Sequence, residues 1–412
     1  MATSGSTNFS VTASDVINHA LRIVGFLSDG ETSSGQPQND ALRSLNMMIK
    51  AWQAEGIGLW KNDEIAIFQS DEGYSYDIGP SGDHATSSYI KTEVATAAAS
   101  AATSLVVDSV TGFGDNFDRN GLVTAYDLSS ASAPSLNGAL VSAGVATMTS
   151  PRKILIYSNG DDSGVTFSVS GTDADGTTQS ETITGGDTTT VYSTYEYATV
   201  TAISASTTGG SNAMEVGQVG DFLGIERDSG DLQWTNIGAA VSTTLTLIDA
   251  LSGAVAVDNH VYTYTNKISR PMELIEARIH RADDNETPLR MLSRQEYMNL
   301  ADKDATGLAN SVYLDPQRTN AKLYVWPACD DVQDWIMATV RTRIEDLDAV
   351  GNNFDLPAEW YESLVYNLAV RLGAEYGRDV TPSVAALAID SKMRADDFDR
   401  EPAPITFELV NY

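Results

Sequence analysis

Histidine and cysteine side chains offer the most versatile chemistry in this chain of 412 residues, which has four histidines and one cysteine. These residues are His19, His84, His260, His280 and Cys329. The histidines lie far apart in the sequence, form no HExxH pair and do not neighbour the cysteine, whereas a zinc site needs ligands at short, regular spacings. We therefore expect no metal site. His19 falls in a helical stretch, and we interpret it as a structural or surface residue.

The loop GTDADGTTQSET raises the question of a calcium site. If Gly176 filled the glycine position of an EF-hand loop, Asp173 and Asp175 would occupy the third and fifth ligand positions. Gly171 and Thr182 would then occupy the first and twelfth positions, where neither offers a suitable side-chain ligand. The flanking residues also alternate like strands, so the loop favours a hairpin turn over a cation site.

Paired carboxylates are the groups that glycoside hydrolysis requires on the two sides of a cleft. Adjacent pairs occur at Asp161-Asp162, Asp283-Asp284, Asp330-Asp331 and Asp396-Asp397. With 56 acidic residues in the chain, such pairs arise by chance, and we interpret them as solvated surface. The sequence contains no GxSxG elbow, no GxxxxGK[ST] loop and no strand-linked GxGxxG. We therefore expect no cofactor and no enzymatic activity.

Trp234, in DLQWTNIG, is the tryptophan that we expect to be exposed and able to stack on a sugar. The formal net charge of −31 gives a surface that repels nucleic acid and anionic lipid. No apolar run is long enough to span a membrane, and the N-terminus does not read as a signal peptide. We expect a soluble protein without a membrane partner.

Helical periodicity is confined to the two ends of the chain. Near the start, Thr12 and Asp15 form a potential capping box, and DALRSLNMMIKAWQAEG follows as a second helix. Near the end, LPAEWYESLVYNLAVRLGAEYGR places large apolar residues four apart. The predicted helical core consists of Leu45, Ile49, Trp52, Trp360, Leu364, Leu368 and Leu372.

Between these ends, residues 85–265 are rich in Ser, Thr and Gly and alternate in short runs, which is typical of antiparallel β-structure. TSLVVDSVTGFGDN and TTLTLIDALSGAVAVDN echo one another. Either a small β-unit is split by a second one inserted at about Asn137 to Asn212, or two hairpins are alike by chance.

We therefore predict an α+β multidomain fold. A helical domain with a small sheet is built from residues 1–84 and 266–400, because a two-helix hairpin cannot bury its apolar faces alone. A large antiparallel β-sandwich or barrel, residues 85–265, interrupts that domain. Residues 401–412 form an extended tail.

Parts of the chain resemble the head-to-tail adaptor family of short-tailed bacteriophages, also described as tail accessory or packaged-DNA-stabilisation proteins. The likeness is most specific in LPAEWYESLVYNLAVRL and diffuse elsewhere, over about Ser14 to Phe68 and Lys267 to Tyr412. The β-rich middle lies outside it and looks like the immunoglobulin-like modules that decorate phage structural proteins.

The resemblance implies a non-enzymatic virion protein at the head-tail junction, made in the host bacterial cytoplasm. It implies a dodecameric ring below the portal protein that helps to retain packaged DNA and offers an attachment surface to a downstream tail or nozzle protein. Tail fibres are a further possible partner, and double-stranded DNA would pass through without tight binding. The family's C-terminal extension grips the portal; here its anchors would be Ile405, Phe407, Leu409, Val410 and Tyr412.

Two alternatives remain open at the level of sequence. The chain could be a receptor- or glycan-binding tail protein that acts through its β-domain. It could also be a peptidoglycan hydrolase, although the sequence selects no catalytic residue for that reaction.

Overall fold

The computed structural model describes residues 9–56, 58–114 and 116–399. The chain divides into two compact units. We call them the helical unit, Met1–Asn62 with Arg341–Tyr412, and the β unit, Asp63–Val340. The unit boundaries thus lie after Asn62 and before Arg341, whereas the sequence suggested boundaries at residues 84 and 266.

The predicted α+β class, with a helical adaptor domain that includes a small sheet, is wrong. Strands make up 38% of the chain and helices 19%. The alternating segments near both ends, such as Asn62–Phe68 and Glu273–His280, do not join the helices. Their apolar residues share a separate core that includes Ile65, Ile67 and Ile279. In these segments every second side chain lies on the same face of a sheet, and that face is buried by packing against another sheet. The segments therefore belong with the β-structure.

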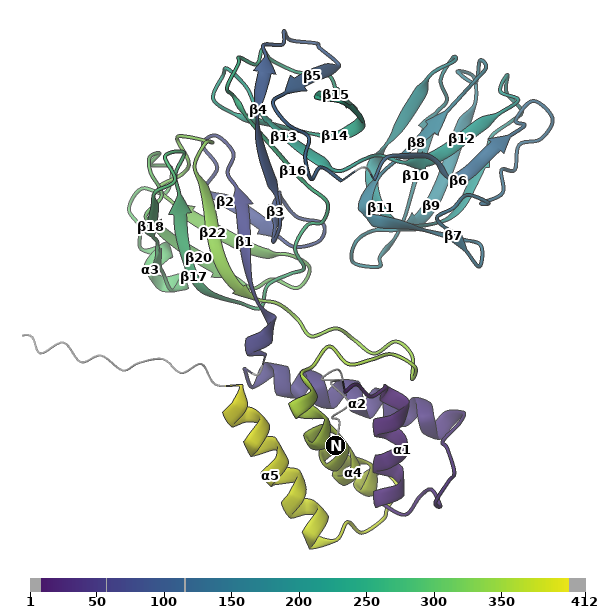
Figure 1. Cartoon of the computed structure of the whole chain (residues 1–412), viewed down its shortest axis with the longest axis vertical. Helices are drawn as coiled ribbons and strands as arrows, with labels where there is room; N and C mark the ends of the chain where they lie inside the picture. Colours follow the sequence, from purple (N-terminus) through teal and green to yellow (C-terminus); the bar gives the residue numbers. More distant parts are fainter. Residues whose placement is uncertain (1–8, 57, 115, 400–412) are drawn as a thin grey trace, which may run out of the picture. The chain divides into compact units, whose positions relative to one another are not determined.

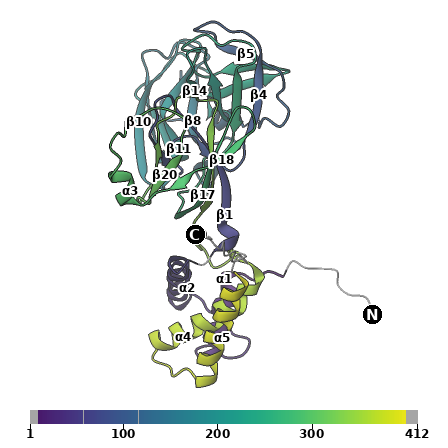
Figure 2. The same cartoon turned by 90° about the vertical axis from the view of Figure 1, so that its left-hand side faces the viewer.

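The helical unit is built from helices at the two ends of the chain (Figures 1 and 2). They are α1 (Ala13–Ile23), α2 (Gln36–Ala54), α4 (Tyr361–Glu375) and α5 (Pro382–Phe398), with the 3₁₀ turns η1 (Leu59–Lys61) and η2 (Ala358–Trp360). The predicted capping box is confirmed. Thr12 Oγ1 accepts a hydrogen bond from Asp15 N, and Asp15 Oδ2 accepts one from Thr12 N at 2.9 Å. Gly377, which follows the C-cap residue Tyr376 of α4, has φ +62°, which glycine adopts without strain.

The β unit contains one short helix and the described strands, except for Asn62 of β1 and Arg341 of β22, which fall in the helical unit. These elements are β1 (Asn62–Phe68), β2 (Ser75–Ile78), β3 (Ala85–Thr86), β4 (Ile90–Thr96), β5 (Ser104–Val107), β6 (Asp118–Tyr126), β7 (Val141–Ser142), β8 (Val145–Tyr157), β9 (Thr166–Thr172), β10 (Thr178–Thr184), β11 (Thr190–Ala205), β12 (Met214–Gln218), β13 (Phe222–Glu226), β14 (Leu232–Val241), β15 (Thr244–Leu247), β16 (His260–Tyr264), β17 (Glu273–His280), β18 (Glu286–Pro288), β19 (Arg290–Met291), α3 (Arg294–Met298), β20 (Ser311–Asp315), β21 (Ala321–Trp326) and β22 (Trp335–Arg341).

These strands form several sheets. Two smaller sheets run in the orders β18-β17-β22-β1-β3 and β19-β20-β21-β2. A seven-stranded sheet has the order β10-β9-β11-β8-β12-β6, with β7 beside β8. A closed barrel has the order β13-β14-β15-β5-β4-β16. Closure leaves the barrel without edge strands, and its apolar residues form a core of their own.

The barrel strands come from two separate stretches of chain. β4 and β5 precede the seven-stranded sheet, and β13 to β16 follow it, so β6 to β12 interrupt the barrel. The inserted stretch therefore spans residues 118–218, wider than the stretch from Asn137 to Asn212 considered from the sequence. The two echoing segments are neighbours in the barrel, since β5 pairs with β15 and Leu105 lies opposite Leu245.

Candidate functional site

The residues predicted as the helical core lie together in the helical unit. Leu45, Ile49, Trp52, Trp360, Leu364, Leu368 and Leu372 belong to one cluster and are between 0% and 5% exposed. The Trp360 ring lies between those of Trp52 and Trp60, with centroids 5.7 Å and 5.8 Å away. Both ends of the chain thus contribute to a single core. The predicted portal anchors Ile405, Phe407, Leu409, Val410 and Tyr412 lie outside the described residues.

Helix α5 has one side packed with small residues and an outer surface with large apolar ones. Its buried residues are Ala388, Ser391 and Ala395. Its exposed apolar residues are Leu387, Ile389, Met393 and Phe398, which are 41% to 64% exposed. Ile389 and Met393 lie one helical turn apart and therefore side by side, and contiguous exposed apolar side chains commonly mark a protein-binding surface.

Ion pairs offset the charges of two basic residues on α5. Lys392 Nζ lies 2.6 Å from Glu55 Oε2, and Arg394 Nη2 lies 2.5 Å from Asp390 Oδ2. The outer surface of α5 therefore combines exposed apolar side chains with charged groups such as the Arg394–Asp390 pair.

The acidic loop considered for calcium forms the turn between β9 and β10, as the sequence favoured. Asp173 Oδ1 accepts hydrogen bonds from the backbone N–H groups of Asp175 and Thr177, each at 2.9 Å, so it stabilises the turn itself. Across the described ranges, no group of three or more His, Cys, Asp or Glu residues is arranged to hold a metal ion.

Asp162 is the exception among the carboxylate pairs, since Asp283-Asp284 and Asp330-Asp331 are exposed as predicted. Its side chain is completely buried. Asp162 Oδ1 accepts hydrogen bonds from Gly210 N at 2.8 Å and Ser211 N at 3.0 Å, and Oδ2 accepts one from Ser211 Oγ. These donors compensate the burial, so Asp162 ties the loop before β9 to the loop before β12.

His84 lies in an aromatic cluster of the β unit. Its ring stacks on Trp234 with centroids 3.7 Å apart, and its Nδ1 lies 2.5 Å from the hydroxyl oxygen of Tyr264. Burial lowers the pKa of His84 well below its usual range, and the positive charge of Lys267 lowers it further. His84 is therefore neutral near pH 7.

Trp234 does not have the open ring face that the sequence suggested. One face stacks on His84, and the ring lies directly across from Gly224 in the pairing of β13 and β14. A Cβ built at position 224 would lie only 2.7 Å from Cη2 of Trp234. Trp234 is therefore half-buried rather than fully exposed, and His84 covers one face of its ring.

The remaining histidines and the cysteine have separate environments. His260 Nδ1 lies 3.5 Å from Glu226, although burial lowers the pKa of His260. His280 stacks on Trp335 with centroids 4.2 Å apart. His19 is exposed on α1, in agreement with a surface role. Burial raises the pKa of the Cys329 thiol to about 12, so this buried thiol is not a nucleophile near pH 7.

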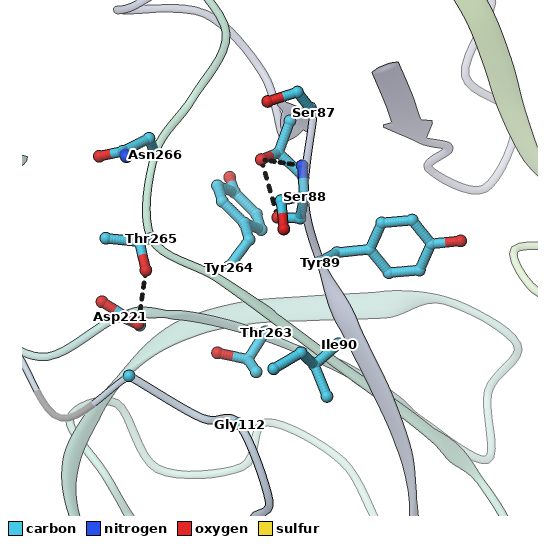
Figure 3. Close-up of a pocket in the computed structure, with 12 residues that line it drawn as sticks. Ser87, Ser88, Tyr89, Ile90, Gly112, Asp221, Thr263, Tyr264, Thr265 and Asn266 are labelled. Carbon is cyan, nitrogen blue, oxygen red and sulfur yellow. Dashed lines mark hydrogen bonds between the residues drawn. The ribbon is translucent and has the colours of Figure 1, made fainter. Parts of the chain in front are cut away.

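A pocket of about 260 Å³ lies at the start of β4 and the end of β16 (Figure 3). Its walls come from Thr86–Ile90, from Gly112 and Gly114, and from Thr263–Asn266, with Asp221 on a further side. Figure 3 shows Tyr264 between the Ser87–Ser88 stretch and the Thr265–Asn266 stretch. The ring of Tyr89 points away from Tyr264 (Figure 3). The pocket thus brings together short loops that flank the barrel strands.

Asp221 anchors this pocket through a buried network. Its Oδ1 accepts hydrogen bonds from Asn116 Nδ2 at 2.6 Å and from Arg152 Nη1 at 3.4 Å, and its Oδ2 accepts one from Thr265 Oγ1 at 2.9 Å. Arg152 is fully buried and also donates from Nη2 to Ser150 Oγ at 2.6 Å. Burial lowers the pKa of Arg152, and the Asp221 carboxylate opposes that effect.

This network was not predicted from the sequence. Arg152 belongs to β8 of the seven-stranded sheet, whereas Asp221 precedes β13 of the barrel. An arginine in an otherwise alternating apolar strand, in PRKILIY, was the one available signal, because a buried charge requires a partner.

None of the described helices combines the length and hydropathy that crossing a membrane requires. Comparison with known proteins adds no relative: no protein-family model matches the chain, and no curated protein sequence matches it.

Proposed function

We propose that the chain is a structural virion protein that joins the head of a short-tailed bacteriophage to its tail. In this role copies of the chain form a ring below the portal protein, help to retain the packaged DNA, and provide the attachment surface for a downstream tail or nozzle protein. The proposal rests on the helical unit and not on the fold class of the whole chain, which is mostly β.

The observation that supports the proposal most strongly is the shared core of the two chain ends. The adaptor-like segments around Leu45 and Leu364 lie far apart in the sequence, yet they pack into one helical cluster. Trp360, in the most specific part of the resemblance, is at 0% exposure in that cluster. The helical parts of the two segments that resemble the adaptor family therefore share one core, whereas residues 267–340 belong to the β unit.

The outer surface of α5 supports a protein partner for that body. Ile389 and Met393 are exposed, lie one helical turn apart, and are followed within a few residues by the segment 401–412. Alternate apolar side chains in an extended segment can fill pockets of a partner while its backbone adds hydrogen bonds. We assign the portal protein as the partner of both the α5 surface and this segment.

The acidic surface suits passage of DNA. With a net charge of −31, a ring of many copies would repel phosphate and would not retain DNA by backbone contacts. The packaged DNA is instead retained because the ring closes the head.

A docking assay with portal-bearing heads tests the proposal. The first variant lacks residues 401–412, and the second carries Ile389→Ser with Met393→Ser. We expect each to remain folded and to lose docking by at least about tenfold, since burial of one large apolar side chain contributes about 1.5–3 kcal/mol. Met47→Ser on α2 is the matched control, because Met47 is 54% exposed in the same unit. Normal docking of both test variants would contradict the proposed attachment surface.

A further inference from the structure

The pocket beside Asp221 has a wall chemistry that the attachment role does not use. Of the twelve residues that line it, nine have polar side chains, and none is a lysine or arginine. Its volume of about 260 Å³ lies just below the range of about 300–1,000 Å³ typical of drug-sized ligands. This space suits a compact molecule with many hydrogen-bonding groups.

The charge at the pocket favours a neutral ligand. Asp221 is the one acidic side chain among the lining residues, and the fully buried Arg152 forms an ion pair with it. An anionic ligand would meet a carboxylate with no lysine or arginine among the lining residues to compensate it. A cationic ligand would gain little, because Arg152 already neutralises that carboxylate.

The polar groups of the pocket are arranged in two layers. At the base, the Thr265 hydroxyl donates a hydrogen bond to Asp221 Oδ2, so the Thr265 oxygen can still accept a hydrogen bond from a ligand (Figure 3). At the rim, Ser87 and Asn266 are exposed. A hydroxyl and a carboxamide both donate and accept hydrogen bonds, so base and rim together match alternating hydroxyl groups of a ligand.

The loop that closes one wall requires glycine. A Cβ at position 114 would lie 2.3 Å from Oδ2 of Asp221, and a Cβ at position 112 would lie 2.9 Å from Cδ1 of Ile90. Gly112 also has φ +82°. Backbone therefore approaches the carboxylate directly, and the base of the pocket has a fixed shape.

We propose that this pocket binds one neutral, polyhydroxylated ring, such as a hexose or N-acetylhexosamine residue. The proposal is independent of the virion role and does not use Trp234, whose ring is already packed. Recognition comes from hydrogen bonds to Thr265, Ser87 and Asn266, with the pocket wall excluding larger rings.

Ligand-detected NMR on the full chain tests the proposal. The probes are glucose, galactose, N-acetylglucosamine and the anionic glucuronate. We expect saturation transfer to at least one neutral sugar and weaker transfer to glucuronate. Asn266→Ala and Ser87→Ala should each weaken that binding by about 2- to 10-fold, since one hydrogen bond contributes about 0.5–1.5 kcal/mol. Both residues are exposed, so these substitutions should not disturb folding.

Ser180→Ala, in the exposed strand β10, is the matched control and should leave binding unchanged. Absence of transfer to every neutral sugar would overturn the proposal. Equal binding by wild type, Asn266→Ala and Ser87→Ala would place the sugar elsewhere and would also overturn it. Tighter binding of glucuronate than of glucose would refute the electrostatic argument.

A disaccharide of the sugar that binds distinguishes two sources of the ligand. Binding as tight as that of the monosaccharide identifies the end of a glycan chain, because one ring enters while the next remains outside. Loss of binding identifies a free sugar.

Discussion

Replacing Trp360 by alanine should destabilise the helical unit by about 3–5 kcal/mol. The Trp360 side chain is fully buried and contacts the rings of Trp52 and Trp60. Truncation at this position would open a cavity inside a cluster that joins both chain ends, and the helices can collapse into it only in part.

Trp360→Phe should cost much less. The buried Nε1–H of Trp360 makes no hydrogen bond with any described residue, and burial of an unpaired donor costs about 1–3 kcal/mol. Phenylalanine keeps a ring in the cluster and removes that donor. We expect a loss below about 1.5 kcal/mol for this substitution.

Urea unfolding followed by circular dichroism at 222 nm measures both effects. This signal reports mainly on the helical unit because, among the described helices, only the five-residue α3 belongs to the β unit. Met47→Ala is the surface control. A Trp360→Ala midpoint equal to that of the control would refute the assignment of Trp360 to the core. Equal losses for the alanine and phenylalanine variants would refute the reasoning about the unpaired donor.

Two predictions concern the β unit. His84 has a pKa held below its usual value of about 6.5, so below that pH the unfolded chain binds a proton that the folded chain does not. Stability should fall with acid by up to about 1.4 kcal/mol per pH unit, and His84→Gln should reduce this slope in urea titrations; an unchanged slope would exclude His84 as its source. Arg152→Met should cost about 3–5 kcal/mol because Asp221 stays buried without its cation. Adding Asp221→Asn should recover part of that loss, and no recovery would argue against an electrostatic origin.

The helical core could be predicted from sequence because its determinants are local. Trp360, Leu364, Leu368 and Leu372 repeat every four residues, and that spacing alone places them on one side of a helix. The merging of both chain ends followed from the need of each hairpin to bury its apolar side. The strands near the chain ends could not be assigned to the β unit in this way. Alternation predicts which residues lie on each face of a strand, but it does not predict which strand pairs with it.

The pocket could not be predicted for a related reason. Arg152 and Asp221 are brought together by contact between the seven-stranded sheet and the barrel. The pairing of Gly224 with Trp234 depends on strand register. Spacing along the chain contains neither piece of information. Trp234 is half-buried where the sequence predicted an exposed ring, since a glycine directly across a hairpin can accommodate a large ring.

Sedimentation of the purified chain with and without the portal ring of its phage tests the central proposal most directly. We predict that the chain migrates with the portal as a ring of many copies, and that the chain lacking residues 401–412 does not. Failure of the full-length chain to associate with the portal would contradict the attachment role, whether or not the isolated chain forms oligomers.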